Sequence, residues 1–289
     1  MRLFRERMVS QMRKIIDLSQ HNSFPTSWEM VKAEVDGVIL RCGYRGYGKS
    51  GTLVEDKKFR HFKKMCKLYQ IPWGVYFFPT AVNISEAREE SGFVANLIAG
   101  EDVSFPVFAD SEKSHPLGLG RSDNLSKADR TTYLIEFLEG MKVYGYNAGV
   151  YASTSWFKDR LDDSRLLKYP HWVAQYAKKC TYSGNMDGWQ FSSKESVTGI
   201  PGRVDMSEWY GPQAETHMIA LPTLRRGNKG AEVIILQSNL QACGYAIQID
   251  GSYGPATEGA VKNWQRLVGL NPDGIYGPKS YAAMKQALE

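Results

Sequence analysis

Short apolar runs, each ending in polar or aromatic residues, recur through the first two-thirds of the chain. They predict eight β-strands, at residues 14–19, 37–43, 72–78, 106–112, 147–153, 171–177, 186–192 and 202–208. Segments with the spacing of amphipathic helices separate the early strands, as at residues 56–69, 85–98 and 127–144. This alternation of strands and helices indicates an α/β fold with parallel pairing.

Eight such units over about 200 residues predict a barrel closed on itself. The late gaps, residues 178–185 and 193–201, are too short for a crossover helix. We therefore expect a modified β/α barrel, with about five β/α units followed by three strands without helices.

The chain changes character after residue 211. Residues 212–222 are predicted to be a linker, and residues 223–289 a small helical bundle domain. The bundle contains an internal repeat, because Asp250-Gly251-Ser252-Tyr253-Gly254-Pro255 recurs as Asp273-Gly274-Ile275-Tyr276-Gly277-Pro278. Its predicted core consists of Val233, Leu236, Leu240, Val261, Trp264 and Leu267. Residues 14–211 then form the barrel, and residues 1–13 an N-terminal extension.

The most informative chemical feature is the pair Asp110 and Glu112 at the end of the fourth predicted strand. On a strand, residues i and i+2 share a face, roughly 6–7 Å apart. Paired carboxylates suit the cleavage of glycosidic bonds, although such a pair alone also fits a solvated loop. Asp17 on the first strand and Asp205 on the eighth change this balance. Catalytic groups of β/α barrels lie at the C-terminal ends of the strands, so all four carboxylates are expected to converge at one mouth.

Six motifs together resemble lysozymes of glycoside hydrolase family 25, the N-acetylmuramidases found in many phage endolysins, over roughly residues 14–210. They are Ile15-Ile16-Asp17-Leu18-Ser19, Gly74-Val75-Tyr76-Phe77-Phe78, Phe108-Ala109-Asp110-Ser111-Glu112, Trp172-Val173-Ala174-Gln175-Tyr176, Trp189-Gln190-Phe191 and Val204-Asp205-Met206. Residues 223–288 resemble the peptidoglycan-binding domain 1 family in Leu224, Gly227, Gly230, Val233, Leu236-Gln237 and the two Asp-Gly turns.

The resemblance implies hydrolysis of the β-1,4 bond between N-acetylmuramic acid and N-acetylglucosamine in bacterial peptidoglycan. It implies Glu112 as the general acid, with a pKa raised by a negative neighbour such as Asp110. Asp110 is expected to orient the 2-acetamido group of the substrate, and Asp17 and Asp205 to stabilise the transition state or position water. Two mechanisms stay open: one in which the acetamido group of the substrate is the nucleophile, and one that uses a protein base.

Further side chains near strand ends are candidates for binding the glycan. Aromatic rings could stack on sugars or pack the barrel, with about equal weight, and the two glutamines could bond an acetamido group or satisfy loop backbone. These candidates are Tyr76, Phe78, Trp172, Gln175, Tyr176, Trp189 and Gln190. Arg41 and Arg45 could meet a substrate carboxylate, or could be solvated surface charges.

Composition narrows the choice of partners. The net charge of +5 and pI near 8.8 favour an anionic surface such as a bacterial wall. The five histidines and four cysteines form no zinc pattern, so neither metal nor cofactor is implied. Nucleic acid is not an expected partner. Membrane insertion is not expected either, since no apolar stretch approaches ~20 residues, and the oligomeric state is left open.

The first residues carry no apolar stretch typical of a secretory signal. We therefore expect an endolysin that is made in the bacterial cytoplasm and acts on the wall after release. Two alternatives stay open: a wall-binding protein with weak or no catalysis, and a hydrolase of chitin-like polysaccharides.

Overall fold

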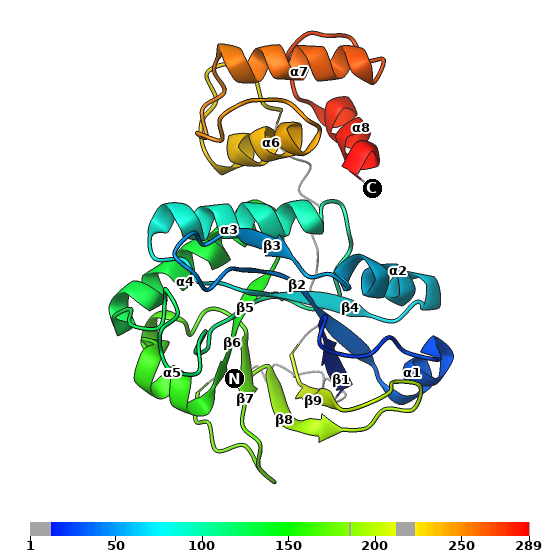
Figure 1. Ribbon diagram of the computed structural model, residues 1–289, viewed down its shortest axis with the longest axis vertical. Coiled ribbons are helices and arrows are strands. Elements are labelled where there is room, and N and C mark those ends of the chain that lie inside the picture. The colour runs from blue at the N-terminus through cyan, green and yellow to red at the C-terminus, as the bar shows by residue number, and fades with distance from the viewer. Residues whose placement is uncertain (1–12, 185, 212–222, 289) are drawn as a thin grey trace, which may run out of the picture.

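The computed structural model describes residues 13–184, 186–211 and 223–288. The predicted linker and nearly all of the predicted N-terminal extension lie outside this range. Described strands and helices form a barrel, with a small helical module beside it (Figure 1).

Eight strands close the barrel, which confirms the predicted fold. Their order around it is β1-β9-β8-β7-β6-β5-β4-β2, and β2 pairs again with β1. The strands are β1 (Arg13–Leu18), β2 (Gly37–Arg45), β4 (Trp73–Phe78), β5 (Val107–Asp110), β6 (Ala148–Ser153), β7 (His171–Ala174), β8 (Gly188–Glu195) and β9 (Val204–Trp209). A ninth strand, β3 (Leu53–Glu55), pairs with the outer end of β2. The strand β3 is absent from the predicted strands because three residues are too few to show an alternating pattern.

The expectation of parallel pairing is wrong for β9. This strand runs antiparallel to both of its neighbours, β8 and β1. Only residues 196–203 separate β8 from β9, too few for the crossover that a parallel return needs. The chain therefore turns back directly, and β9 begins at the rim where the other strands end.

Five helices cover the first part of the barrel, as predicted. They are α1 (Trp28–Glu34), α2 (Phe59–Tyr69), α3 (Ile84–Leu97), α4 (Lys127–Val143) and α5 (Thr154–Arg160), the last followed by the 3-10 turn η1 (Asp163–Arg165). Four of them begin where the side chain of Ser27, Asn83, Ser126 or Ser153 accepts a bond from a backbone N–H of the first turn. Within the described residues, no helix follows β7 or β8.

Alternate residues along each strand face two different cores. One set packs between strands and helices, and includes Val75 and Phe77. The other fills the barrel interior with Ile15, Ile39, Phe105, Phe108, Trp172 and Trp209. The large interior rings need glycines opposite them: a Cβ on Gly188 would lie 2.6 Å from the Trp209 ring. The interior is thus a packed plug that supports the rim above it.

The module contains α6 (Ala231–Ala242), α7 (Pro255–Leu267) and α8 (Pro278–Leu288). A buried glutamine holds each repeated turn: Gln237 bonds Asp250 and the N–H of Gly251, and Gln265 bonds Asp273 and the N–H of Gly274. The module core contains five of the six predicted residues, Val233, Leu236, Leu240, Val261 and Trp264. The sixth is a correction, because Leu267 is 76% exposed at the end of α7.

The helix α6 joins the module to the barrel. It packs against α3, and its Ile235 is buried within the core of the barrel domain (Figure 1). Apolar residues therefore cover two faces of α6, one for its own bundle and one for the barrel. The module is docked on the barrel rather than tethered only through its linker.

Candidate active site

Three carboxylates come from barrel strands and point to the interior at one rim. Asp17 on β1 pairs in register with Asp205 on β9. Asp17 lies near the end of its strand and Asp205 near the start of its own, and the antiparallel direction of β9 brings them to the same rim. Asp110 is the last residue of β5.

Glu112 reaches the same site from just beyond β5. The strand ends two residues earlier than predicted, but the alternation continues: the Oγ atom of Ser111 accepts a bond from Trp156 Nε1 at 3.1 Å on the helix side. Glu112 therefore faces the barrel mouth like Asp110. The two carboxyls differ in access, since Asp110 is 5% exposed and Glu112 lies open to solvent.

Each of the four carboxyls has a pKa above its usual value, and burial is the main cause in every case. The charge of Asp205 adds to the rise at Glu112 and at Asp17, and the charges of Glu112 and Asp17 add to it at Asp110. Glu112 is accessible from the mouth, yet protein surrounds it closely enough to desolvate its charge. The site therefore favours holding protons on carboxyls that would be ionised in water.

Asp110 has a buried carboxyl oxygen that no protein group in the described part of the chain satisfies. Its Oδ1 atom is buried without a hydrogen-bond partner. Arg41, on β2, partly offsets the rise of its pKa. Arg41 is itself held by Asp56, whose Oδ2 accepts from Nε at 2.7 Å. An acceptor without a protein partner can bind a donor from a ligand or from water.

Gln190 organises the opposite side of the mouth. Its Nε2 donates to Asp17 Oδ2 at 2.8 Å, and its Oε1 accepts from the hydroxyls of Tyr151 and Tyr176, at 2.8 and 3.0 Å. The amide is thereby fixed in one orientation, with its N–H toward the carboxylate. Tyr176 remains 59% exposed, so its ring is available at the mouth.

The other predicted binding residues divide into two groups. Tyr76 lies at the rim, edge-on to Trp172 at 6.3 Å, and Phe78 contacts Tyr47 at 5.7 Å. Trp172 is 2% exposed in the barrel plug and donates to Ser207, so it packs the interior instead of offering a face to a sugar.

Two further candidates serve the loop after β7. Gln175 binds Thr181 through both ends of its amide, and Trp189, on the outer face of β8, donates to the carbonyl of Gln175. These contacts fit the alternative in which the two side chains stabilise structure.

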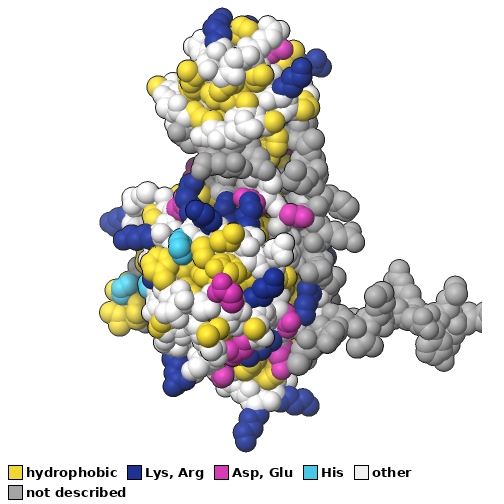
Figure 2. Space-filling view, turned by 90° about the vertical axis from the view of Figure 1, so that its right-hand side faces the viewer, with side chains coloured by type: hydrophobic (Ala, Val, Ile, Leu, Met, Phe, Trp, Pro, Cys, Tyr) yellow, Lys and Arg dark blue, Asp and Glu magenta, His cyan; other side chains and the backbone are white. Residues whose placement is uncertain are grey.

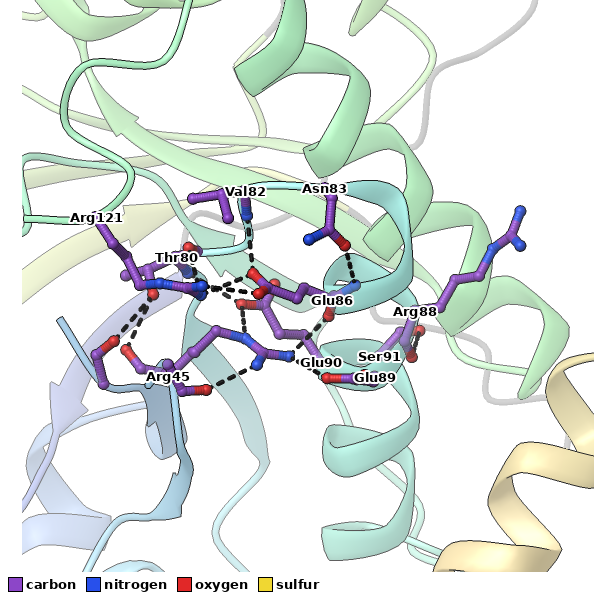
Figure 3. A network of polar contacts seen from close by, with 12 residues as sticks. Arg45, Thr80, Val82, Asn83, Glu86, Arg88, Glu89, Glu90, Ser91 and Arg121 are labelled. Atoms are coloured by element: carbon purple, nitrogen blue, oxygen red, sulfur yellow. Dashed lines mark hydrogen bonds and ion pairs between the residues drawn. The ribbon is translucent and has the colours of Figure 1, made fainter. Parts of the chain in front are cut away.

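Arg45 is not a solvated surface charge, and its bonds within the protein leave it no role in meeting a substrate carboxylate, contrary to both expectations. It is buried and donates to Glu90 at 2.9 Å, to Glu89 at 3.0 Å and to two backbone carbonyls (Figure 3). Arg121 pairs with Glu86 beside it. This charge network belongs to the barrel wall.

Tyr151 and Asp56, the partner of Arg41, are not among the site residues predicted from the sequence. Tyr151 was recognisable in principle, since it stands level with Asp110 on the neighbouring strand and shares its face. The role of Asp56 was not, because it follows the unpredicted strand β3.

Within the described residues, no group of three or more His, Cys, Asp or Glu side chains is arranged to hold a metal ion. The helices in that part of the chain include none long and apolar enough to cross a membrane.

Residues 16–200 match glycosyl hydrolases family 25, and residues 229–284 match a putative peptidoglycan binding domain. The chain belongs to glycosyl hydrolases family 25. This confirms the resemblance found in both parts of the sequence.

Relatives of this family-25 protein include wall-lytic enzymes. The autolytic lysozyme of Clostridium acetobutylicum is 26% identical over 238 residues, which cover 82% of this chain and 69% of the relative. The modular autolysin LytC of Streptococcus pneumoniae, solved with a synthetic peptidoglycan ligand, is 33% identical with a TM-score of 0.62, covering 69% of this chain and 47% of LytC. The CTP1L endolysin is 26% identical with a TM-score of 0.55, covering 68% and 65%. The chain thus spans less than half of LytC.

Proposed function

We propose that this family-25 hydrolase cleaves the β-1,4 bond between N-acetylmuramic acid and N-acetylglucosamine in bacterial peptidoglycan. The observation that carries the proposal is the meeting of Asp17, Asp110, Glu112 and Asp205 at one barrel mouth. Such a site suits a reaction in which positive charge develops on a sugar ring.

Glu112 is the proposed proton donor. It is the most accessible of the four carboxyls, and desolvation together with Asp205 favours its protonated form. Protonation of the glycosidic oxygen allows the bond to N-acetylglucosamine to break. Once it has lost its proton, Glu112 can accept one from water as the second half of the reaction proceeds.

Asp110 is proposed to bind the acetamido N–H of the muramic acid residue. Its buried, unpartnered Oδ1 offers an acceptor at the base of the mouth. That contact would align the acetamido oxygen for attack on the anomeric carbon. Asp17, Gln190 and Asp205 then stabilise positive charge or hold water from the β1–β9 side. Tyr76, Phe78 and Tyr176 are the proposed sugar contacts among the predicted aromatic residues.

Purified walls provide the decisive experiment. The chain should reduce the turbidity of a wall suspension, and mass spectrometry should find the new reducing ends on N-acetylmuramic acid. Reducing ends on N-acetylglucosamine would contradict the assigned bond. Binding without any new ends would favour the wall-binding alternative, and cleavage of chitin oligomers alone would favour the chitinase alternative. The cytoplasmic origin of the enzyme stays a prediction.

A further inference from the structure

A groove of about 840 Å³ lies between the barrel and the module. Its barrel side comes from β3, α2 and α3, and its module side mainly from α6 and α8. This volume is within the range of sites that bind small ligands, about 300–1,000 Å³. We propose that this groove binds the peptide stem of peptidoglycan through its carboxylates; the inference rests on the proposed function.

One wall of the groove is basic. Arg60, Lys63, Lys64 and Lys67 line it from α2, at the i, i+3, i+4 and i+7 spacing that places side chains on one face of a helix. Figure 2 shows Lys and Arg side chains gathered on the barrel beneath the module. An anionic ligand entering between the two domains would meet this face.

The positive charge of this wall is only partly neutralised. Arg60 pairs with Glu55, while Lys63 and Lys67 share the single carboxylate of Glu101, at 3.2 and 2.6 Å. Lys64 is exposed, and it makes no ion pair with the residues that the structure describes. Two ammonium groups on one carboxylate, plus Lys64, leave room for the carboxylates of a ligand.

The rest of the lining selects a peptide over a polyphosphate. Apolar side chains face the groove from both domains, among them Phe93 and Leu97 from α3 and Met284 from α8. The Oδ1 atom of Asn96, another lining residue, is buried without a hydrogen-bond partner. A side-chain amide can pair with both the N–H and the C=O groups of a peptide backbone, whereas a phosphate lacks the N–H donor. A short acidic peptide with aliphatic side chains satisfies all three features.

One chain segment connects the lining of the groove with the support of the catalytic mouth. Glu55 lines the groove, and the next residue, Asp56, holds Arg41 near Asp110. The same short segment therefore borders both sites. A glycan strand in the mouth carries its peptide stems beside it, so one polymer can engage the two sites at once, which raises its effective concentration.

The binding test uses the full chain with Glu112→Gln, which removes the proposed acid, and the synthetic tripeptide N-acetyl-L-Ala–γ-D-Glu–L-Lys, which carries two carboxylates and one ammonium group. Calorimetry should give saturable binding that weakens about fivefold in Lys64→Glu, the equivalent of about 1 kcal/mol. Ser238→Trp, which fills the groove from α6, should abolish it. Lys57→Glu, with the same charge change at an exposed position outside the groove lining, should bind as the parent does.

Equal tripeptide affinity in the parent, Lys64→Glu and Ser238→Trp chains would overturn the proposal. So would tight binding of a glycerol phosphate oligomer in place of the tripeptide, or unchanged affinity for a tripeptide with amidated carboxyls.

Activity separates this inference from the proposed function. With an intact Glu112, Lys64→Glu and Ser238→Trp should cleave peptide-free glycan strands at the parental rate and intact walls more slowly. If the unmodified chain cleaves neither substrate, the proposed function fails, whatever the groove binds. If the variants cleave intact walls at the parental rate, the groove inference fails alone.

Discussion

Two clusters of buried charge lie in this barrel, and they are built in opposite ways. At the mouth, four carboxyls face one another with Arg41 as the nearby cation. In the wall, Arg45 and Arg121 pair with Glu90 and Glu86 through short hydrogen bonds (Figure 3). Both clusters interrupt an apolar environment, but only in the wall cluster does each carboxylate pair with an arginine.

This difference separates function from structure. A cluster of paired charges stabilises the fold while it stays intact, because loss of one partner leaves a buried charge alone. A cluster of unpaired carboxylates becomes more stable when it loses a charge, so such a cluster is retained where a reaction needs the charge. Residue type did not distinguish the two clusters in the sequence, since Arg41 and Arg45 were equivalent there.

The largest expected effect is on catalysis at the mouth. Glu112→Gln should lower the lysis rate by about 10³-fold, because it removes the proton donor, while the binding of intact walls persists. The assay is the initial rate of turbidity loss at equal protein concentration. Glu136→Gln, which disturbs only a surface ion pair with Arg88, is the matched control and should lyse normally. Lysis by the Glu112→Gln chain at the parental rate would refute the role of Glu112.

Breaking the wall cluster should instead cost stability. Burial raises the pKa of Glu90 to about 7. Arg45→Met leaves this buried carboxylate without its arginine and should lower the free energy of unfolding by about 3 kcal/mol at pH 8. The loss should shrink at pH 5, where Glu90 is protonated in either chain. Denaturant unfolding at the two pH values measures this effect. Equal losses at both would contradict the assignment, and adding Glu90→Leu should restore part of the stability.

The mouth should respond in the opposite direction. Burial and the charge of Glu112 raise the pKa of Asp110. Asp110→Asn removes this carboxyl, so it should increase the free energy of unfolding by about 1 kcal/mol at pH 7 and lower activity. Because the folded-state pKa is raised, the folded protein binds more protons than the unfolded chain above pH ~4, and the wild type loses stability as pH rises. The gain should therefore disappear toward pH 3. A loss of stability at pH 7 would show that Asp110 is paired after all.

The smallest expected effect concerns the amide that orients Asp17. Tyr151→Phe removes one of two hydroxyl bonds to Gln190 and should reduce kcat/KM about fivefold, equivalent to about 1 kcal/mol. Thermal unfolding should change little by comparison with Arg45→Met. An unaltered kcat/KM would mean that Tyr176 alone fixes the amide.

Much of this architecture was predictable because strand periodicity is local. The eight barrel strands, the five helix-covered units and the Asp-Gly turns all follow from short-range patterns. The strand β3 was not predictable in this way because it is very short. The direction of β9 was not either, because it depends on how the barrel closes. The two-faced α6 was also predicted only for its own bundle, because its second apolar face is explained by a partner far away in sequence.

The sequence by itself determined which residues are candidates for the chemistry: Asp17, Asp110, Glu112 and Asp205 are each marked by a strand end and a family motif. Tertiary structure decided what each charge experiences. Burial and long-range neighbours set whether a carboxyl is paired, as Glu90 is with Arg45, or left facing other carboxyls, as Asp110 is. The physical reason is that a pKa depends on charges and solvent within a few ångströms in space, and in a closed barrel those neighbours come from strands as distant as β1 and β9.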